Sequence, residues 1–499
     1  MSQGDLIGHW IDGKGQSGRA DRAGDVFDPA TGEVQARVAF ASSDEVEAAV
    51  ASAKAAFESW RHSSLTARVR ILFAYRDILE RRKKDLARVV TSEHGKVLSD
   101  ALGEVSRGQE VVEFACGIPH LLKGEYSENV SRNVDAYSIQ QPLGVVAGIS
   151  PFNFPVMVPM WMFPVAIACG NTFILKPSEK DPSASILLAE WFSEAGLPEG
   201  VFNVVQGDKV AVNRLLEHPD VAAISSVGST PVAQHIYATA SRHGKRVQAL
   251  GGAKNHMVVM PDADLDAAAD AAVSAGYGSS GQRCMAISAI VAVGDSGDQL
   301  IDKIAERMAK LKIAPGTVED ADMGPLVTRD HRDKVASYIE VGESEGARLV
   351  VDGRAAKVDG GEGGFFLGPT LFDGVGPEME IYRDEIFGPV LGVMRAGTLQ
   401  EAIDVINANP YGNGTAIFTS NGAAARAFQQ EVQVGMVGIN IPIPVPMAFF
   451  SFGGWKQSLY GDAHVHGREG VHFYTHTKAV TSRWRESSAS SVNLGFPSN

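Results

Sequence analysis

Val145-Val-Ala-Gly-Ile149 is a short apolar run, and Ser150-Pro-Phe-Asn-Phe-Pro155 follows it as a loop that leads into a helix. The same succession of apolar run and amphipathic stretch recurs as far as residue 250. Strands that alternate with helices in this way predict a parallel sheet covered on both faces, so we expect an α/β fold. The expected strands are residues 145–149, 172–175, 201–205, 221–225 and 246–250, and the expected helices lie near residues 161–168, 186–192 and 234–240.

Further elements flank this first sheet. Before it, Ser42 and Glu45 form a capping-box pattern that starts a helix running to Trp60, and apolar spacing predicts a second helix from Val69 to Leu79. After Asp264 the alternation resumes and predicts a second α/β domain. Its expected helices lie near residues 265–275 and 299–311, and its expected strands near residues 289–293 and 415–418.

Two extended stretches break the alternation. Residues 129–140 are polar and lack helical periodicity, and residues 471–481 form a second extended stretch near the carboxyl end. Ribbons that a monomer does not need often pair with another subunit, which makes both stretches candidates for an oligomerisation element. A pair of ordinary edge hairpins explains the pattern equally well. Ser487 to Ser491 begins a tail that we expect to be mobile.

The composition is that of a globular protein with two or three domains: 499 residues, 44% hydrophobic and 21% charged. A net charge of -14 without a basic block argues against nucleic acid and membrane partners. Three cysteines without a C-x-x-C pair exclude a disulfide framework or a structural zinc site. No signal-peptide pattern or long apolar segment is present, so we expect a cytoplasmic protein, or a mitochondrial matrix protein if this is a processed eukaryotic form.

Two motifs carry no function in our interpretation. Residues 13–18 match G-x-G-x-x-G, but no convincing strand precedes them, so we interpret them as a tight turn. His464, His466, His472 and His476 lack the spacing of a tetrahedral metal site and are expected to be solvated loop histidines, so we expect no metal.

Polar residues follow three of the expected strands, at the ends where α/β sheets bind ligands. Asn153 could donate a hydrogen bond to a developing oxyanion, although a turn between two prolines explains it as well. Lys176 and Glu179 suit ribose hydroxyls, and Glu179 would repel a 2′-phosphate, which favours NAD over NADP. Ser229, with free amides at a helix start, suits a pyrophosphate. Three such loops in one sheet indicate a nucleotide site.

A cysteine downstream has the surroundings of a nucleophile. Gly276-Tyr-Gly-Ser-Ser-Gly-Gln-Arg-Cys284-Met285 places the thiol among small residues, which leaves room for a substrate. We therefore interpret Cys284 as a catalytic thiol.

These motifs, with Gly170-Asn-Thr172, Gly228-Ser-Thr230 and Glu385-Ile-Phe-Gly-Pro389, occur in the order found in aldehyde dehydrogenases, which the chain resembles over nearly its whole length. The resemblance implies Cys284 as nucleophile, and Asn153 with the Cys284 amide as oxyanion hole. It implies NAD contacts from Ser150, Phe152, Lys176, Glu179, Lys180, Ser229, Gly251, Glu385 and Phe387. It also implies an NAD-binding domain of residues 1–122 and 142–254, a catalytic domain of residues 255–455, and a ribbon and tail of residues 123–141 and 470–490 that builds a homodimer or homotetramer.

The segment Gln248-Ala-Leu-Gly-Gly252 departs from the family pattern, which usually reads Glu-Leu-Gly-Gly with a glutamate that activates hydrolytic water. Here Ala249 has no ionisable group. Gly252-Ala-Lys-Asn-His256, Arg283-Cys-Met-Ala286 and Asn440-Ile-Pro-Ile-Pro-Val-Pro446 resemble the methylmalonate-semialdehyde dehydrogenases, a subfamily that produces acyl-CoA. Both observations favour coenzyme A as the acyl acceptor, because a thiolate attacks a thioester readily where water lacks a base.

The substrates of that subfamily, methylmalonate and malonate semialdehyde, carry a carboxylate that needs a cation. Arg283 is adjacent to the nucleophile, and the resemblance places Arg107 on a helix that lines the substrate tunnel. The alternative for each arginine is a surface salt bridge.

Two rival functions remain open at this point. One is a hydrolytic aldehyde dehydrogenase whose water is oriented by Gln248 or Glu385. The other is a retired enzyme kept as a binding protein, which the joint retention of Cys284, Asn153, Glu179 and Glu385 argues against.

Overall fold

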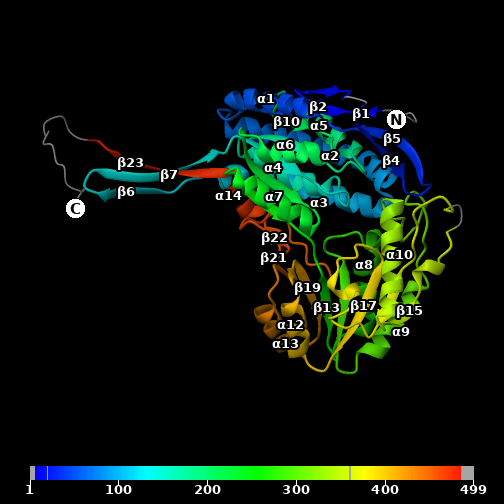
Figure 1. Ribbon diagram of the computed structural model, residues 1–499. Coiled ribbons are helices and arrows are strands. Elements are labelled where there is room, and N and C mark those ends of the chain that lie inside the picture. The colour runs from blue at the N-terminus through cyan, green and yellow to red at the C-terminus, as the bar shows by residue number, and fades with distance from the viewer. Residues whose placement is uncertain (1–5, 19–20, 359–360, 485–499) are drawn as a thin grey trace.

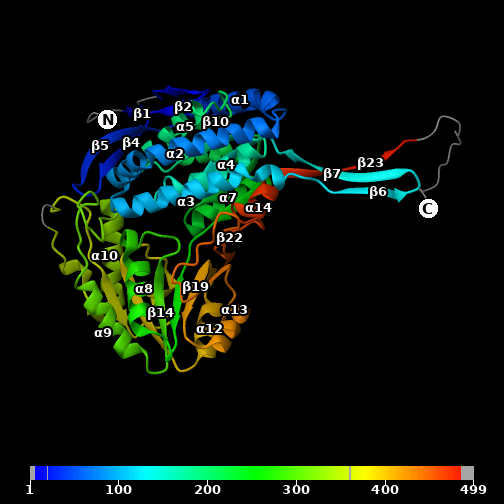
Figure 2. The same cartoon turned by 180° about the vertical axis from the view of Figure 1, so that it is seen from behind.

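The computed structural model describes residues 6–18, 21–358 and 361–484, so the tail expected at Ser487 to Ser491 lies outside the described residues. Two large sheets, each covered by helices, form the body of the molecule, and a narrow three-stranded arm projects from it (Figures 1 and 2). None of the described helices is both long enough and apolar enough to cross a membrane.

The first sheet has eight strands in the order β22-β12-β11-β8-β9-β10-β2-β3. Its five central strands are parallel to one another and match the five strands expected from the sequence, whose apolar runs are explained by burial on both faces. The strands are β2 (His9–Ile11), β3 (Lys14–Gln16), β8 (Val145–Ile149), β9 (Thr172–Lys176), β10 (Phe202–Val204), β11 (Val221–Val227), β12 (Arg246–Leu250) and β22 (Leu459–Tyr460).

Helices cover both faces of this sheet. On one face lie α1 (Ser43–Trp60), α6 (Lys209–Glu217) and α7 (Thr230–Arg242). On the other lie α2 (Leu65–His94), α3 (Leu98–Cys116), α4 (Met157–Ala168), α5 (Ser183–Glu194) and α14 (Gly467–Phe473), with the short helix η1 (Ile118–His120) after α3. The capping box is confirmed, since Ser42 and Glu45 each accept the other's backbone amide. Every residue of α4 is buried, as its uniformly apolar sequence requires.

The second sheet has seven strands in the order β15-β16-β17-β14-β13-β19-β20, and apart from β15 neighbouring strands are parallel. The strands are β13 (Asn255–Val259), β14 (Ile287–Val293), β15 (Arg348–Val351), β16 (Thr370–Asp373), β17 (Val390–Ala396), β19 (Gly414–Phe418) and β20 (Met436–Ile439). α8 (Leu265–Tyr277) and α9 (Gly297–Met308) cover one face, and α10 (Arg329–Ser344), α11 (Glu380–Arg383), α12 (Leu399–Ala408) and α13 (Gly422–Glu431) cover the other. The expected second α/β domain is therefore present.

Small elements complete the chain. A three-stranded sheet joins β1 (Leu6–Ile7), β5 (Glu33–Ala39) and β4 (Ala23–Asp28), and a two-stranded ladder joins β18 (Tyr411–Gly412) and β21 (Trp455–Lys456). The short helices η2 (Gly278–Gly281) and η3 (Gly353–Ala355) follow α8 and β15.

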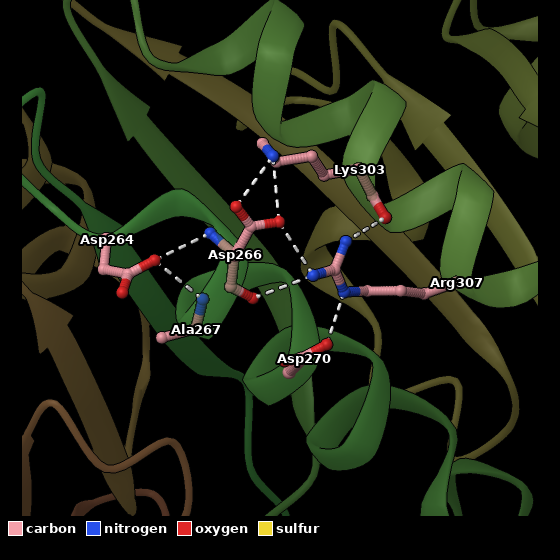
Figure 3. Close-up of polar contacts among 6 residues, drawn as sticks. All are labelled: Asp264, Asp266, Ala267, Asp270, Lys303 and Arg307. Atoms are coloured by element: carbon pink, nitrogen blue, oxygen red, sulfur yellow. Dashed lines mark hydrogen bonds and ion pairs between the residues drawn. The ribbon is translucent and has the colours of Figure 1, made fainter.

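An ion network joins α8 to α9 on the molecular surface (Figure 3). Lys303 and Arg307 of α9 both bind the Asp266 carboxylate, at 2.8 and 3.0 Å, and Arg307 also binds Asp270. Asp264 caps α8 by accepting the amides of Asp266 and Ala267. Because the network is exposed, it sets the register of the two helices more than it stabilises them.

The arm consists of β6 (Tyr126–Ser131), β7 (Val134–Pro142) and β23 (Thr475–Arg483), in the order β23-β7-β6. Both expected ribbons lie in it and pair with each other, antiparallel, from Thr475 opposite Pro142 to Arg483 opposite Val134. The expectation that the second ribbon begins at residue 471 was wrong, since residues 471–473 end α14. Their burial against the first sheet favours the helix.

The tight turn expected at residues 13–18 is a hairpin, but it does have a preceding strand. β2 and β3 are antiparallel around Asp12 and Gly13, which both have positive φ, 57° and 69°. β2 has only three residues, which is too short a pattern for its strand to be predicted from the sequence.

Asn171 ties the base of the arm to the first sheet. Its side chain is fully buried, accepts the amides of Leu143 and Gly144 at 2.7 and 3.1 Å, and donates to the carbonyls of Ala166 and Tyr474. Three segments far apart in the sequence thus meet on one amide.

We expect Asn171→Ala to lower the free energy of unfolding by about 3 kcal/mol, because buried backbone groups lose their partner. Chemical denaturation followed by fluorescence measures this change. Asn407→Ala is the matched control, because Asn407 makes similar bonds at the surface and its loss should cost about 1 kcal/mol or less. Equal losses for both variants would contradict the linking role of Asn171.

Candidate active site

A cleft of about 830 Å³ lies at the carboxyl ends of the first sheet's parallel strands and is closed by loops of the second domain. Eleven of the thirteen residues singled out from the sequence line it: Ser150, Phe152, Asn153, Lys176, Glu179, Lys180, Ser229, Gly251, Cys284, Glu385 and Phe387. The two arginines, Arg107 and Arg283, do not line this cleft. Residues from loops more than two hundred positions apart are therefore brought to one place.

Cys284 lies on a tight turn between α8 and β14. Ser279 and Ser280 both adopt a left-handed backbone there (φ 53°), and Asn255 and Asn413 donate to the carbonyl of Cys284 at 2.9 and 3.1 Å. Burial, reinforced by the charge of Glu385, raises the pKa of the thiol to about 12. The two asparagines, which the sequence did not single out, hold the backbone of Cys284 in place.

At the end of β9 and in the loop after it, two lysine side chains each have a partner in the cleft. Lys176 donates to Glu179 at 3.1 Å, and although burial opposes it, the Lys176 charge holds the pKa of Glu179 below its usual value. The Lys180 ammonium lies 4.4 Å from the centre of the Phe152 ring. A charged carboxylate is therefore present in the cleft, and it can accept hydrogen bonds from hydroxyl groups of a ligand.

Phe152 and Phe387 face each other across the two domains, with ring centres 5.8 Å apart. Phe387 has a positive φ of 58°, and its carbonyl lies 2.8 Å from Nε2 of His331, a cleft residue on α10 that the sequence analysis missed. Burial lowers the pKa of His331 to about 4, so its ring is neutral. No motif surrounds His331 that could have indicated it.

Glu385 is held by the connection between the two sheets. Its Oε1 accepts the Ala253 amide at 2.9 Å, and Lys254 donates to the carbonyls of Ile381 and Asp384 at 2.8 Å. A Cβ on Gly252 would lie 2.5 Å from Oε2 of Glu385 and 2.9 Å from Oγ1 of Thr230, so a larger residue there would displace these side chains. Burial raises the pKa of Glu385 to about 7, so this carboxyl titrates near neutrality.

Ala249 and Gln248 lie outside the cleft lining. Ala249 is fully buried in the layer between the first sheet and helices α1, α6 and α7. Gln248 is also buried, accepts the Ser225 hydroxyl at 2.7 Å and donates to the His464 carbonyl at 3.3 Å. Gln248 is therefore not placed to orient a water in the cleft.

Each of the two arginines already has an acidic neighbour. Arg283 donates to Asp100 at 2.7 Å, and both side chains are largely buried. Arg107, on α3, contacts Glu110 at 2.9 Å and the carbonyl of Val445 at 3.3 Å, within the proline-rich stretch of residues 440–446. Asp100 is 183 residues from Arg283 in the sequence, and Val445 is 338 residues from Arg107. Local sequence patterns cannot reveal contacts over such distances.

The four carboxyl-terminal histidines do not converge. Among the residues that the structure describes, no cluster of three His, Cys, Asp or Glu side chains forms a metal site. The expectation of solvated loop histidines was wrong for His466, which is buried and has its ring 5.8 Å from that of Trp161. His472 and His476 are exposed, but they lie in α14 and β23 and not in loops. Burial lowers the pKa of His466 to about 4.

A cysteine and an amide donor line one cleft at the carboxyl ends of parallel strands, where α/β folds bind nucleotides, and this arrangement suits a dehydrogenase with a thiol nucleophile. The Aldehyde dehydrogenase family model matches residues 16–480. The chain belongs to this family.

Two relatives by sequence and one solved structure are similar to this chain over nearly its whole length. A malonate-semialdehyde dehydrogenase from Pseudomonas aeruginosa is 56% identical over 479 residues, covering 96% of each protein. An acylating, mitochondrial methylmalonate-semialdehyde dehydrogenase from Arabidopsis thaliana is 50% identical over 475 residues, covering 95% of this chain and 78% of that one. A Sinorhizobium meliloti protein crystallised with NAD has 52% identity and a TM-score of 0.96, covering 98% of this chain and 99% of that one.

We expect Glu385→Gln to speed alkylation of Cys284 by iodoacetamide several-fold at pH 8, because the variant removes a negative charge that raises the thiol pKa. With a Glu385 pKa of about 7, the carboxyl is protonated at pH 5.5, and the difference between the two proteins should vanish there. Glu179→Gln, which alters another cleft carboxylate, should leave the rate unchanged. Unchanged or slower alkylation of Glu385→Gln at pH 8 would contradict this coupling.

Proposed function

We propose that the chain is an NAD-dependent, CoA-acylating dehydrogenase that converts methylmalonate semialdehyde to propionyl-CoA and malonate semialdehyde to acetyl-CoA, with release of carbon dioxide. The observation that carries the proposal is a single cleft that holds Cys284 and Asn153 beside the nucleotide loops, while position 249 carries alanine. The names of the Pseudomonas and Arabidopsis relatives support the same reaction.

Cys284 would act as the nucleophile and Asn153 as an oxyanion donor. The sulfur bonds to the aldehyde carbon, and the carbonyl oxygen becomes an oxyanion that the Asn153 amide and the Cys284 backbone amide stabilise. When the hydride leaves that carbon, the carbonyl re-forms as a thioester on Cys284. Asn153 supplies the contact without reorganisation, since its side chain already lies in the cleft.

The cleft residues fit NAD, which when bound accepts the hydride. The hydroxyl of Ser150 is buried without a protein partner, and Ser229 makes no capping bond at the start of α7, so both remain for a ligand. Lys176 and Glu179 would hold a ribose, and Phe152, Lys180, Gly251, Glu385 and Phe387 would contact the remaining parts of the nucleotide.

Decarboxylation and acyl transfer would follow on the thioester. The carboxylate is β to the thioester carbonyl, so the carbon–carbon bond can break to give carbon dioxide and an enolate, which takes a proton at its carbon. The CoA thiolate then attacks the thioester carbonyl, and the Cys284 thiolate leaves. Position 249 supplies no base for water, whereas a thiolate needs none.

Arg107 and Arg283 would bind the substrate carboxylate. Arg283 is adjacent to Cys284 in sequence, and its pairing with Asp100 keeps the guanidinium in a fixed orientation. Arg107 is partly exposed and lies against the stretch of residues 445–447. The two guanidinium groups would supply hydrogen-bond donors for the carboxylate that distinguishes these substrates from simple aldehydes.

We further propose a homodimer or homotetramer formed through the arm, in the cytoplasm, or in the mitochondrial matrix if this is a processed eukaryotic form. The arm stands away from the body (Figure 1) and exposes Tyr126 and Val130 to 64% and 50%. Apolar side chains on a projecting ribbon favour burial by another subunit.

One observation favours the hydrolytic alternative. Glu385 lies in the cleft with a pKa of about 7, which suits a general base. Its bond to the Ala253 amide restrains it, and the acceptor experiment below separates the two functions.

We expect malonate semialdehyde and NAD to give one equivalent of NADH per active site without CoA, and sustained turnover to acetyl-CoA when CoA is added. A stalled thioester explains the single burst. Stopped-flow absorbance and mass analysis of the products measure both. Sustained formation of free acid without CoA would establish hydrolysis in place of acyl transfer, and a chain with no burst at all would be the retired enzyme.

We expect Arg107→Met and Arg283→Met each to raise the KM for malonate semialdehyde about 10- to 100-fold, the effect of losing a charged hydrogen bond. The KM for propanal, which lacks the carboxylate, should change less than about threefold. Arg82→Met, at a surface ion pair with Glu194, is the control. An equal rise in the KM for malonate semialdehyde and for propanal would show that the arginine concerned does not bind the carboxylate.

A further inference from the structure

A fully buried ion pair lies directly behind the loop that carries Asn153. Lys96, just before α3, and Glu104, in the second turn of α3, have side chains with 0% exposure and are joined at 2.7 Å. Neither residue lines the cleft. Burying two charges is costly, and a well-packed apolar pair would hold a fold equally well, so stability alone does not account for the pair.

Glu104 holds the far end of the loop. Its Oε1 accepts the amides of Val156 and Met157 at 2.8 and 3.1 Å, which are the first amides of α4. α4 has no side-chain cap of its own, so this carboxylate from another helix takes that place. Its Oε2 binds Lys96, and both carboxylate oxygens are thereby used.

Lys96 holds the near end of the loop. Its ammonium donates to the Asn153 carbonyl at 2.7 Å and lies 4.3 Å from the centre of the Phe154 ring. The ammonium is thus satisfied by a carboxylate, a carbonyl and an aromatic face. The two ends of the segment from Asn153 to Met157 are fixed through one ion pair, which holds the backbone from which the Asn153 side chain extends.

We infer that Lys96 and Glu104 are positioning residues that set the Asn153 amide at the place where the substrate oxyanion develops. The inference rests on the role proposed above for Asn153. The charges strengthen this positioning. The carboxylate accepts two amides and an ammonium together, and the ammonium reaches from it to the Asn153 carbonyl, so each bond is charge-assisted and stronger than a bond between neutral groups. An oxyanion donor displaced by about 1 Å loses a large part of its effect on rate.

The test is a double-mutant cycle on the NADH burst. We expect Lys96→Met to slow the burst about 10- to 100-fold and Asn153→Ala to slow it about 100-fold or more. In the Asn153→Ala background, Lys96→Met should cost less than about twofold, because the residue through which it acts is already gone. Lys96→Arg, which keeps the charge, should restore part of the rate.

Two outcomes overturn the inference. One is an equal cost of Lys96→Met in both backgrounds, which marks a general structural effect. The other is an unchanged burst in Lys96→Met while Asn153→Ala remains slow. An unchanged burst in Asn153→Ala would instead overturn the proposed oxyanion role of Asn153, and with it the basis of the inference.

Controls separate positioning from loss of stability. Arg68→Lys weakens the bonds of a buried arginine to the Ala168 carbonyl at the other end of α4, and it should lower the melting temperature without slowing the burst. NAD affinity and the alkylation rate of Cys284 should be unchanged in Lys96→Met. If Lys96→Met does not fold, Glu104→Gln replaces it in the same double-mutant cycle. An equal cost of Glu104→Gln in the wild-type and Asn153→Ala backgrounds would again contradict the inference.

Discussion

The hydrogen bonds of the short connection between the two sheets hold Cys284 at the cleft. The connection leaves the first sheet at Leu250 and enters the second at Asn255. Within it, the Ala253 amide binds Glu385 and Lys254 binds the carbonyls beside Glu385, while Asn255 binds the carbonyl of Cys284. The loop that carries Cys284 and the loop that carries Glu385 are therefore both hydrogen-bonded to this one segment. If this segment shifted, the cysteine and Glu385 would move together.

Most of the fold follows from local pattern. The central strands of the first sheet are mostly apolar because they are buried on both faces, and such runs are visible without any structure. The candidate site follows from topology: parallel strands end at one edge, so the residues after β8, β9 and β11 had to converge. Ser150, Lys176 and Ser229 therefore line one cleft.

What the sequence could not reveal depends on contacts between distant segments. Asp100 meets Arg283 across 183 positions, and the Phe387 carbonyl meets His331 across 56. His466 lies in a loop by its sequence, yet it is buried against Trp161 of α4. Residues 471–473 look extended by composition, but burial against the first sheet turns them into the end of a helix. In each case tertiary packing overrides a weak local preference.

The side chain at position 249 changes meaning once its surroundings are known. As a sequence feature it is a missing base, but in the structure it lies in the core between the first sheet and its helices, where an unpaired carboxylate would be costly. Alanine is therefore consistent with packing as well as with the absence of hydrolysis. Glu385, a carboxylate that lines the cleft, accepts the Ala253 amide, and this bond restrains its use as a base for water. The thiol of CoA is itself a strong nucleophile and needs no base at position 249 or from Glu385. The absence of a free base therefore disfavours attack by water but does not hinder acyl transfer to CoA.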